Sequence, residues 1–408
     1  MNISKIRDGG LCTAVVMVLL MSAVHQANSS VVDGTPTGRW PTATPASVGL
    51  DQKRLAALGA ALARGKYSLV DSFQVFRCGK VVYERQYSHD YSKIYQKQVG
   101  VRGPLNAHLT GPYNYFDPAF HPYYQSTDLH TMQSISKTVT ATVIGIALAR
   151  GDFKSGLDTP VLTWFDAASV KNVDERKRRM TLKHVLTMTT GLDWNENTAY
   201  DDWQNDASAM EATEDWVKYT IDKPMAQEPG THFAYSSGAT ELLAFIFQKE
   251  TGQDIEAYAE QHLFQPLGMR HHWKRSPLGL IDTEGGIYLN GADLAKVGYL
   301  YVHDGVWGGQ RLLTSEWIKQ ATTPFIDTDW QGLKYGFKWW LYPRKDGVHF
   351  VWMGLGFGGQ RLMVFPEERL IAVFTAWDIL KDPQFDAVLA ERLLPAVLVK
   401  SCPAGEPQ

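Results

Sequence analysis

Ser134 and Lys137 are the first residues whose types and spacing suggest chemistry, because they stand three positions apart at the start of a largely apolar segment. Residues at this spacing share one face of a helix, so the hydroxyl and the amine fall within hydrogen-bonding reach. A serine hydroxyl becomes a nucleophile when a neighbouring base accepts its proton, and burial lowers the pKa of a lysine toward that role. The pair therefore predicts nucleophilic catalysis by Ser134. A capping serine beside a lysine that reaches out to solvent is the alternative.

Tyr235 is a second candidate, this time for proton transfer. It follows the turn signal Pro229-Gly230 and precedes a segment with helical periodicity, so the sequence places it on a loop. A phenol can take a proton from a nucleophile and pass one to a leaving group when a cationic neighbour such as Lys137 lowers its pKa. An ordinary buried tyrosine is the alternative.

The glycine-rich stretch from Gly354 to Gln360 is the third candidate. Glycines let the backbone run close past a substrate and aim an amide into a site. Such an amide can complete an oxyanion hole. A β-bulge or a simple turn explains the same glycines equally well.

Two kinds of periodicity predict the elements that must position these residues. Leucines at helical spacing predict a helix over Asp51–Arg64, and the apolar run Ser134–Ala149 predicts a buried helix that ends at Arg150-Gly151. Runs rich in Val, Phe and Tyr predict two early and four late strands: Asp71–Arg77, Lys80–Tyr87, Lys338–Tyr342, His349–Met353, Arg361–Phe365 and Leu370–Trp377.

The intervening segments complete the expected organisation. Residues 31–46 are rich in Pro, Thr and Gly and predict a loose arm, whereas the aromatic residues 91–124 predict an irregular insertion that is a candidate wall of a site. Residues 182–267 have helical patterns. A last helix is expected over Asp382–Lys400, with Phe385, Leu389 and Leu393 on one face. This order predicts an α/β (α+β) fold with an α lobe inserted between two halves of an α/β lobe.

Ser-x-x-Lys, a later Tyr and a glycine-rich late strand, in this order, resemble the β-lactamase family, particularly its class C, esterase and 6-aminohexanoate-dimer hydrolase branch. The resemblance covers Leu50 to Trp377 and includes the supporting stretches His184–Leu192 and Gly285–Gly298. It implies an antiparallel sheet flanked by the first and last helices, with an inserted all-α lobe. We expect one catalytic domain over residues 30–408, with the α/β lobe at about 47–130 and 275–408 and the α lobe at about 131–274.

The resemblance also implies a role for each motif residue. Ser134 would be acylated, Lys137 would hold or take its proton, and Tyr235 would act as general base and then as general acid toward the leaving group. The backbone amides of Ser134 and Phe357 would form the oxyanion hole. Gly356, Gly358 and Ser237 would contact a small-molecule ester or amide, and hydrolysis of the acyl-enzyme would need no cofactor.

Two departures from the family pattern bear on the substrate. Penicillin-recognising members carry Tyr-x-Asn, where this chain has Ser237, and a Lys or His before Thr-Gly, where it has Gly354. The cation that would hold a substrate carboxylate is missing from its usual place, which favours ester or amide hydrolysis. A β-lactamase or D-Ala-D-Ala carboxypeptidase-like enzyme is the alternative, since another basic residue can supply the charge. A non-catalytic sensor module is disfavoured because Ser134, Lys137 and Tyr235 are all present.

The N-terminal residues predict export. Lys5 and Arg7 precede an apolar run over Leu11–Val24, and small and polar residues follow through Ser30, which is the layout of a signal peptide. The run is shorter than the ~20 residues that cross a bilayer. We therefore expect a signal peptide at residues 1–29, no stable membrane span after its cleavage, and a periplasmic or secreted enzyme.

Three cysteines and an ordinary composition complete the sequence evidence. Cys12 lies in the apolar run, so Cys78 and Cys402 are left to form one disulfide in an exported protein, a hypothesis that packing of the last helix across the sheet favours. A net charge of -3, without a dense basic patch, gives no reason to expect nucleic acid. No metal site is expected, because the chain has no His-Glu-x-x-His motif and the adjacent His271 and His272 point in different directions.

Overall fold

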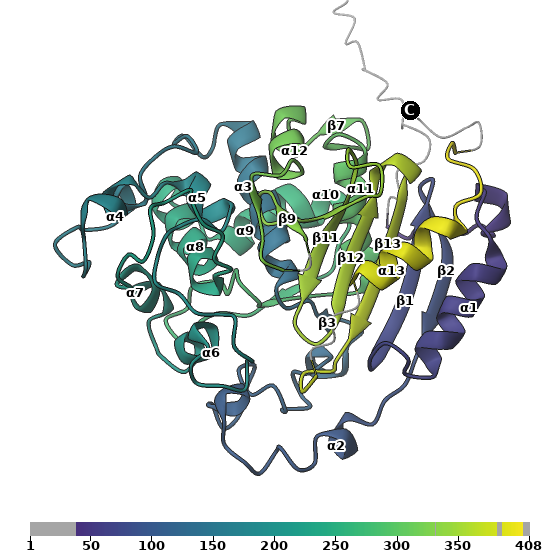
Figure 1. Ribbon diagram of the computed structural model, residues 1–408, viewed down its shortest axis with the longest axis horizontal. Coiled ribbons are helices and arrows are strands. Elements are labelled where there is room, and N and C mark those ends of the chain that lie inside the picture. The colour runs from purple at the N-terminus through teal and green to yellow at the C-terminus, as the bar shows by residue number, and fades with distance from the viewer. Residues whose placement is uncertain (1–37, 331, 382–385, 403–408) are drawn as a thin grey trace, which may run out of the picture. The chain divides into compact units, whose positions relative to one another are not determined.

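Strands from both ends of the chain form one antiparallel sheet in the computed structural model, which describes residues 38–330, 332–381 and 386–402 (Figure 1). The strand order is β2-β1-β13-β12-β11-β10-β9-β8. The strands are β1 (Val70–Arg77), β2 (Lys80–Gln86), β8 (Ile326–Asp327), β9 (Lys334–Tyr335), β10 (Trp340–Pro343), β11 (Phe350–Gly356), β12 (Gln360–Phe365) and β13 (Leu370–Ala376). Because β1 pairs with β13, the last strand holds the first hairpin in the sheet, and the predicted fold class is confirmed.

Helices cover both faces of this sheet. The first and last helices pack on one face and two central helices on the other, namely α1 (Gln52–Ala63) and α13 (Asp386–Leu393), and α3 (Ile135–Arg150) and α11 (Gly291–Val302). Side chains alternate along β13, so that Ala372 and Phe374 join the apolar cluster of α1 and α13 while Ile371 and Val373 join that of α11. The strand β13, which is largely apolar, therefore packs against helices on both faces of the sheet.

The middle of the chain is largely helical, as its patterns predict. It contains α4 (Glu175–Arg179), α5 (Leu182–Leu186), α6 (Asp206–Glu211), α7 (Trp216–Ile221), α8 (Ser237–Thr251), α9 (Ile255–Ala259), a π-helical turn (Glu260–Phe264) and α10 (Gln265–Leu267). A three-stranded sheet of β3 (His130–Thr131), β5 (Ile287–Leu289) and β4 (His272–Trp273) adjoins the start of α3. The smaller elements are α2 (Tyr91–Ile94), β6 (Val306–Trp307), β7 (Gln310–Arg311), α12 (Ser315–Ala321) and 3-10 turns at Ala46–Val48, Pro104–Asn106, Tyr124–Ser126, Val161–Trp164, Pro366–Glu368 and Leu394–Ala396.

The helix α3 is buried along almost its whole length, as its apolar sequence predicts. Val139, Val143 and Ile146 are each at most 1% exposed and belong to the large core that also holds α8 and α11. The helix ends at Gly151, whose left-handed backbone at φ +75° is the usual helix stop for a glycine. A helix buried on all sides holds the residues of its first turn in fixed positions.

The N-terminal arm is not loose where the structure describes it, and our expectation was wrong for residues 38–46. Trp40 is buried against Phe76, with 4.7 Å between ring centroids, and its indole nitrogen donates a hydrogen bond of 2.8 Å to the Ala292 carbonyl. Thr42 pairs with Val81 beside β2. One tryptophan buries enough apolar surface to fix a segment whose Pro, Thr and Gly content favours irregular backbone.

The C-terminal helix is shorter than the predicted Asp382–Lys400. The helix α13 ends at Leu393 and passes into the 3-10 turn Leu394–Ala396. Pro395 explains this, because proline has no backbone N–H to donate and its ring clashes with the carbonyl four residues earlier. Leu389 and Leu393 are buried as expected, whereas Phe385 lies outside the described residues, as do residues 1–37 with the predicted signal peptide and its cleavage site.

A disulfide joins Cys78, in the turn between β1 and β2, to Cys402 near the end of the described chain, with 5.7 Å between the Cα atoms. The neighbouring Arg77 is buried and donates hydrogen bonds of 2.6 Å to the Val48 carbonyl and 3.0 Å to the Lys400 carbonyl. The C-terminal tail is therefore fixed to the first hairpin by a covalent bond and by a buried guanidinium.

The aromatic insertion at residues 91–124 is irregular apart from the short helix α2 and 3-10 turns, as predicted. It nevertheless packs closely, since Tyr95, Tyr113 and Tyr115 are 3–7% exposed. Tyr115 lies edge-on to Phe357 of the glycine-rich stretch, with 6.3 Å between ring centroids. The insertion thus reaches the residues that the sequence analysis singled out.

Two features are absent from the described residues. None of their helices has the length and apolar character needed to cross a bilayer. They also contain no group of three or more His, Cys, Asp or Glu side chains arranged to hold a metal ion.

Candidate active site

Ser134 stands at the N-terminus of α3, and a turn with one unusual residue presents it there. Gln133, which precedes it, has a left-handed backbone at φ +48°, a conformation that costs a non-glycine residue of order 1 kcal/mol. The Ser136 hydroxyl donates a hydrogen bond of 2.6 Å to the Gln133 carbonyl and accepts one of 3.0 Å from the Ile287 amide. The strained turn is held by these bonds, and Ser134 is left partly exposed at the helix start.

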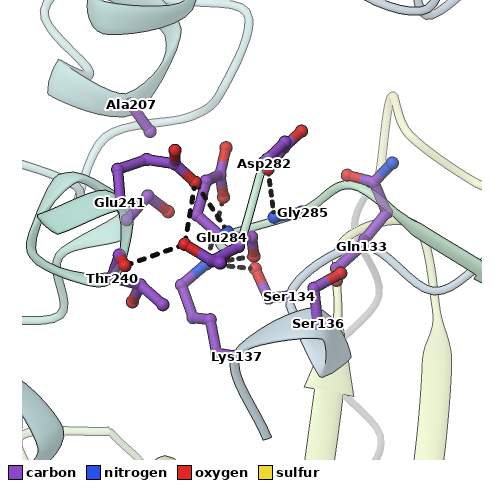
Figure 2. A network of polar contacts seen from close by, with 12 residues as sticks. Gln133, Ser134, Ser136, Lys137, Ala207, Thr240, Glu241, Asp282, Glu284 and Gly285 are labelled. Carbon is purple, nitrogen blue, oxygen red and sulfur yellow. Dashed lines mark hydrogen bonds and ion pairs between the residues drawn. The ribbon is translucent and has the colours of Figure 1, made fainter. Parts of the chain in front are cut away.

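Lys137 is 1% exposed and reaches back to Ser134 from the first turn of α3. Its ammonium group lies 2.9 Å from the Ser134 hydroxyl, 2.7 Å from the Glu284 carbonyl and 3.1 Å from Glu284 Oε2. Figure 2 shows these three side chains converging. Since a lysine has three N–H donors, all of them are engaged. The structure therefore brings the predicted pair together and adds Glu284, which the sequence analysis missed.

Tyr235 lies in the loop before α8, and its ring packs on Trp340 with 5.4 Å between centroids. It is hydrogen-bonded to Ser134, and the Lys137 ammonium lies 5.1 Å from the centre of its ring. Burial raises the pKa of Tyr235, and the Lys137 charge offsets this only in part. The phenol is therefore neutral at pH 7 and stands beside both the hydroxyl and the ammonium.

The pKa of Lys137 does not follow the expectation drawn from burial alone. Burial by itself lowers this pKa, but the neighbouring Tyr235, Glu284 and Glu196 together raise it above the usual value of a lysine. The sequence analysis considered desolvation without knowing which carboxylates would be nearby. In the resting protein Lys137 is consequently an ammonium ion.

Four buried carboxyl groups lie behind Lys137: Glu211, Glu241, Asp282 and Glu284. The Glu284 amide donates a hydrogen bond of 2.9 Å to Glu241, and the Gly285 amide donates one of 2.8 Å to Asp282 (Figure 2). Two buried cations accompany them, Lys137 and Lys274, the latter 3.4 Å from Asp282. Four carboxylates cannot all be charged beside only two cations.

The protons of this cluster are unevenly distributed. Burial and the charges of nearby carboxylates raise the pKa of Glu211 and Glu241 well above the usual range. Burial also acts to raise the pKa of Glu284, but the Lys137 ammonium and a hydrogen bond from Glu211 lower it overall. The contact with Lys137 therefore favours the carboxylate form of Glu284, whereas burial favours the protonated forms of Glu211 and Glu241. One sequence signal pointed to this cluster, because Glu241 interrupts an otherwise apolar helical run.

Ser237, predicted to contact substrate, is 1% exposed and faces a buried partner instead. Its amide and its hydroxyl each donate a hydrogen bond of 2.7 Å to Glu196. Trp194 and Tyr200 donate further hydrogen bonds of 2.8 Å to the same carboxylate. A substrate would therefore meet Glu196, which lines the pocket, rather than Ser237.

The glycine-rich stretch forms the turn between β11 and β12. A side chain at Gly356 would approach the Met132 carbonyl within 2.4 Å, so only glycine fits there. Gly358 has a left-handed backbone at φ +82°, and Gln360 donates a hydrogen bond of 2.7 Å to the Phe357 carbonyl. Gly354 leaves little room for a lysine or histidine, because a Cβ there would lie 3.2 Å from Ile135 of α3.

A cavity of about 510 Å³ opens in front of Ser134. Ser134, Tyr235, Gly356 and Phe357 all line it, whereas Gly358 and Ser237 do not. Its walls are rich in aromatic residues: Trp194, Tyr200, Phe233, Trp330, Trp340 and Phe357. A hydroxyl, an ammonium ion and a phenol in mutual contact at such a cavity can attack an acyl carbon and move a proton to its leaving group.

Comparison with known sequences places this geometry in a family. The family model described as Beta-lactamase matches residues 68–391. The 6-aminohexanoate-dimer hydrolase of Paenarthrobacter ureafaciens is 23% identical over 64% of this chain and 69% of its own length. Esterase EstB of Burkholderia gladioli is 27% identical over 35% of this chain and 37% of its own length.

Solved structures agree with the sequence comparison in fold. A Bacillus anthracis protein provisionally assigned as a 6-aminohexanoate-dimer hydrolase matches with a TM-score of 0.63 and 18% identity over 89% of both chains. EstCE1, a hydrolase with promiscuous acyltransferase activity, matches with a TM-score of 0.60 and 15% identity over 85% of this chain and 98% of its own. Because the family model matches the strands of the sheet and the helical segment alike, this chain belongs to the beta-lactamase family of serine hydrolases.

Proposed function

We propose that the protein hydrolyses an ester or amide through an acyl-enzyme on Ser134, with Lys137 and Tyr235 handling the protons. The observation that carries this proposal is the contact of 2.9 Å between the Lys137 ammonium and the Ser134 hydroxyl, beside Tyr235 and at the wall of the large cavity. A capping serine beside a solvent-directed lysine is not supported, because Lys137 is buried and its amine is directed at the serine.

The protonation states favour a proton relay through Tyr235 over a mechanism in which a neutral Lys137 acts as the base. Tyr235 accepts the Ser134 proton while it donates its own proton to the leaving oxygen or nitrogen, so the phenol is regenerated in the same step. A bond forms between Ser134 Oγ and the acyl carbon, and the bond to the leaving group breaks. Lys137 remains cationic and stabilises the charge that develops on the serine oxygen. The amides of Ser134 and Phe357, both at the cavity, are the proposed oxyanion donors.

The charges around the cavity favour uncharged or cationic substrates over anionic ones. Glu196, Asp201 and Asp329 line it together with two basic residues, and one of these, Arg361, is paired with the buried Asp386. A substrate carboxylate, such as that of a β-lactam, would meet three acidic groups in this lining, and one of the two lining cations is already paired. Membership of the beta-lactamase family is therefore not a sufficient reason to expect lactamase activity. An ester or an amide with an aliphatic or aromatic acyl group suits the aromatic walls.

We also propose that the protein is exported. The disulfide between Cys78 and Cys402 supports this, since such bonds persist in oxidising compartments. Non-reducing peptide mapping of protein from the periplasm or medium should recover the linked pair. Recovery of the protein only from the cytoplasm would contradict export, and two free thiols in exported protein would contradict the disulfide.

The first experiment is an assay of the mature protein with p-nitrophenyl acetate, p-nitrophenyl butyrate, a 6-aminohexanoate dimer and nitrocefin, beside Ser134→Ala. We expect ester or amide turnover that falls at least ~10³-fold in the variant, with weaker turnover of nitrocefin. Faster turnover of nitrocefin than of every ester and amide would favour a β-lactamase. No turnover of any substrate, and no labelling of Ser134 by a fluorophosphonate, would favour a non-catalytic sensor module.

A further inference from the structure

Ser134 also borders a second, much smaller cavity, on the side of the carboxyl cluster. This cavity measures about 20 Å³, slightly more than the ~10–15 Å³ that one water molecule needs. Its lining includes Ser134, Glu284, Glu211 and Ala207. The cavity has the size of a single water and borders polar groups, among them Ser134, the residue that would carry the acyl group.

From this geometry we infer that the small cavity holds the hydrolytic water and that Glu284 is the general base that activates it. The inference rests on the proposed acyl-enzyme and adds a division of labour to it: Tyr235 serves acylation from the large cavity, and Glu284 serves deacylation from the small one. Lys137 lies between them and contacts both Ser134 and Glu284.

Glu284 has the contacts that this role requires. One of its oxygens is 3.1 Å from Lys137, and the carboxyl group also accepts a hydrogen bond from Glu211. A carboxylate offers about four acceptor positions, so a water in the cavity finds an acceptor beside these two partners. The lowered pKa of Glu284 keeps it ionised, and the raised pKa of Glu211 keeps that neighbour a hydrogen-bond donor.

The proton balance of the step closes within these residues. The water oxygen bonds to the acyl carbon and its proton passes to Glu284. When the bond between the acyl carbon and Ser134 Oγ breaks, the serine oxygen takes a proton from the Lys137 ammonium, 2.9 Å away. Glu284 then returns its proton to the Lys137 amine over their 3.1 Å contact. The products are the free acid and the resting enzyme, with no co-reactant other than water.

The test separates acylation from deacylation by stopped-flow kinetics with p-nitrophenyl acetate and by intact-protein mass spectrometry. For Glu284→Gln we expect a burst of about one nitrophenolate per enzyme, followed by steady-state turnover at least ~10²-fold slower than in the wild type. An acetyl adduct on Ser134 should accumulate. If burst and steady-state rates fell by the same factor without an adduct, Glu284 would act only by positioning Lys137, and the inference would be overturned.

A second variant leaves every polar group in place and fills the cavity instead. Ala207→Val adds two methyl groups at the lining, and we expect it too to retain the burst and to lose steady-state turnover. Ala209→Val, on the same helix α6 but outside the cavity lining, is the matched control and should behave like the wild type. Wild-type turnover by a folded Ala207→Val would overturn the inference. Should Glu284→Gln fail to fold, as judged by circular dichroism, Ala207→Val decides the question.

The two proposals fail in different ways. A wild-type protein that never forms a covalent adduct on Ser134 would contradict the proposed function itself. A wild-type protein that forms the adduct, with variants that deacylate normally, would contradict only the role of Glu284 and the small cavity.

Discussion

Two buried lysines, Lys137 and Lys338, show how strongly their surroundings determine what the same residue type can do. Each is 1% exposed, yet the pKa of Lys137 is raised and that of Lys338 is lowered well below the usual value. Burial lowers both. The difference is that Tyr235, Glu284 and Glu196 raise the pKa of Lys137. The charge of Lys137 instead lowers the pKa of Lys338, which donates to the Thr240 hydroxyl at 3.1 Å and the Met188 sulfur at 3.3 Å.

The comparison teaches that burial alone does not create a lysine base in this protein. Lys338 is the lysine whose pKa is lowered, but it is not part of the cavity lining and touches neither Ser134 nor Tyr235 in the contacts described above. Lys137 has the position for catalysis and the charge of an ammonium ion. Its proposed role is therefore to stabilise charge and to return protons, rather than to start the reaction as a free base.

The strongest test of the comparison is the same substitution at both sites. Lys137→Met should reduce ester hydrolysis by at least ~10³-fold, because Ser134 loses its cationic partner. Lys338→Met keeps a chain of similar volume and removes only a buried polar group, so turnover should stay within about 2-fold of the wild type and unfolding free energy within about 1.5 kcal/mol. Comparable losses of activity in both variants would break the distinction.

Tyr235→Phe tests the phenol separately from its packing. The ring keeps its contact with Trp340 while the proton relay is lost, so the acylation rate should fall by about 10²–10⁴-fold with little change in stability. The burst phase with p-nitrophenyl butyrate measures this rate. An unaltered burst would show that Lys137, not Tyr235, takes the serine proton.

The pH dependence of stability should distinguish the two lysines by sign. Lys338 binds its proton more weakly in the folded than in the unfolded state, so its contribution to stability rises with pH, up to the unfolded pKa near ~10.4. Lys137 binds its proton more strongly when folded, so its contribution is present below that pKa and is lost only above it.

Urea unfolding at pH 7 and pH 9 measures this sign. Lys338→Met removes one group whose contribution to stability rises with pH. The unfolding free energy of the wild type relative to the variant should therefore increase over this interval, by up to about 1.4 kcal/mol per pH unit. A difference that stayed the same between pH 7 and pH 9 would mean that Lys338 is charged in the folded protein.

Thr240→Val should have the smallest effect. It removes the oxygen that accepts a hydrogen bond from Lys338, at a cost of about 1 kcal/mol of unfolding free energy, and leaves turnover unchanged. Thermal unfolding with a parallel ester assay checks both. A loss of activity would mean that the hydrogen bond of Lys338 affects catalysis at the Lys137 site.

Local patterns were sufficient for most of the fold. Runs rich in Val, Phe and Tyr predicted β1, β2 and the late strands β10 to β13, and the unbroken apolar run predicted α3 as a buried helix, because composition and hydrophobicity are properties of neighbouring residues. The errors came from long-range contacts. Trp40 is ordered by Phe76 and Ala292, which no pattern within residues 31–46 could indicate.

The candidate site divides in the same way. Ser134, Lys137 and Tyr235 were found from spacing and order, and the structure brings them together at one cavity. Glu284 and Glu196 were missed, since each becomes relevant only by meeting a distant partner: Glu284 stands 147 positions from Lys137 and Glu196 stands 41 positions from Ser237.

The sequence by itself determined that a hydroxyl and an amine share one face at the start of a buried helix, because a spacing of three residues fixes that geometry locally. Only the tertiary structure decided the charge of that amine. Its protonation depends on burial, on Tyr235 and on two carboxylates that act through space, Glu196 from the loop before α6 and Glu284 from the segment before β5. The fold thereby placed Glu284 against Lys137, left Lys338 without such a contact among its described partners, and opened two cavities of different size at the same serine.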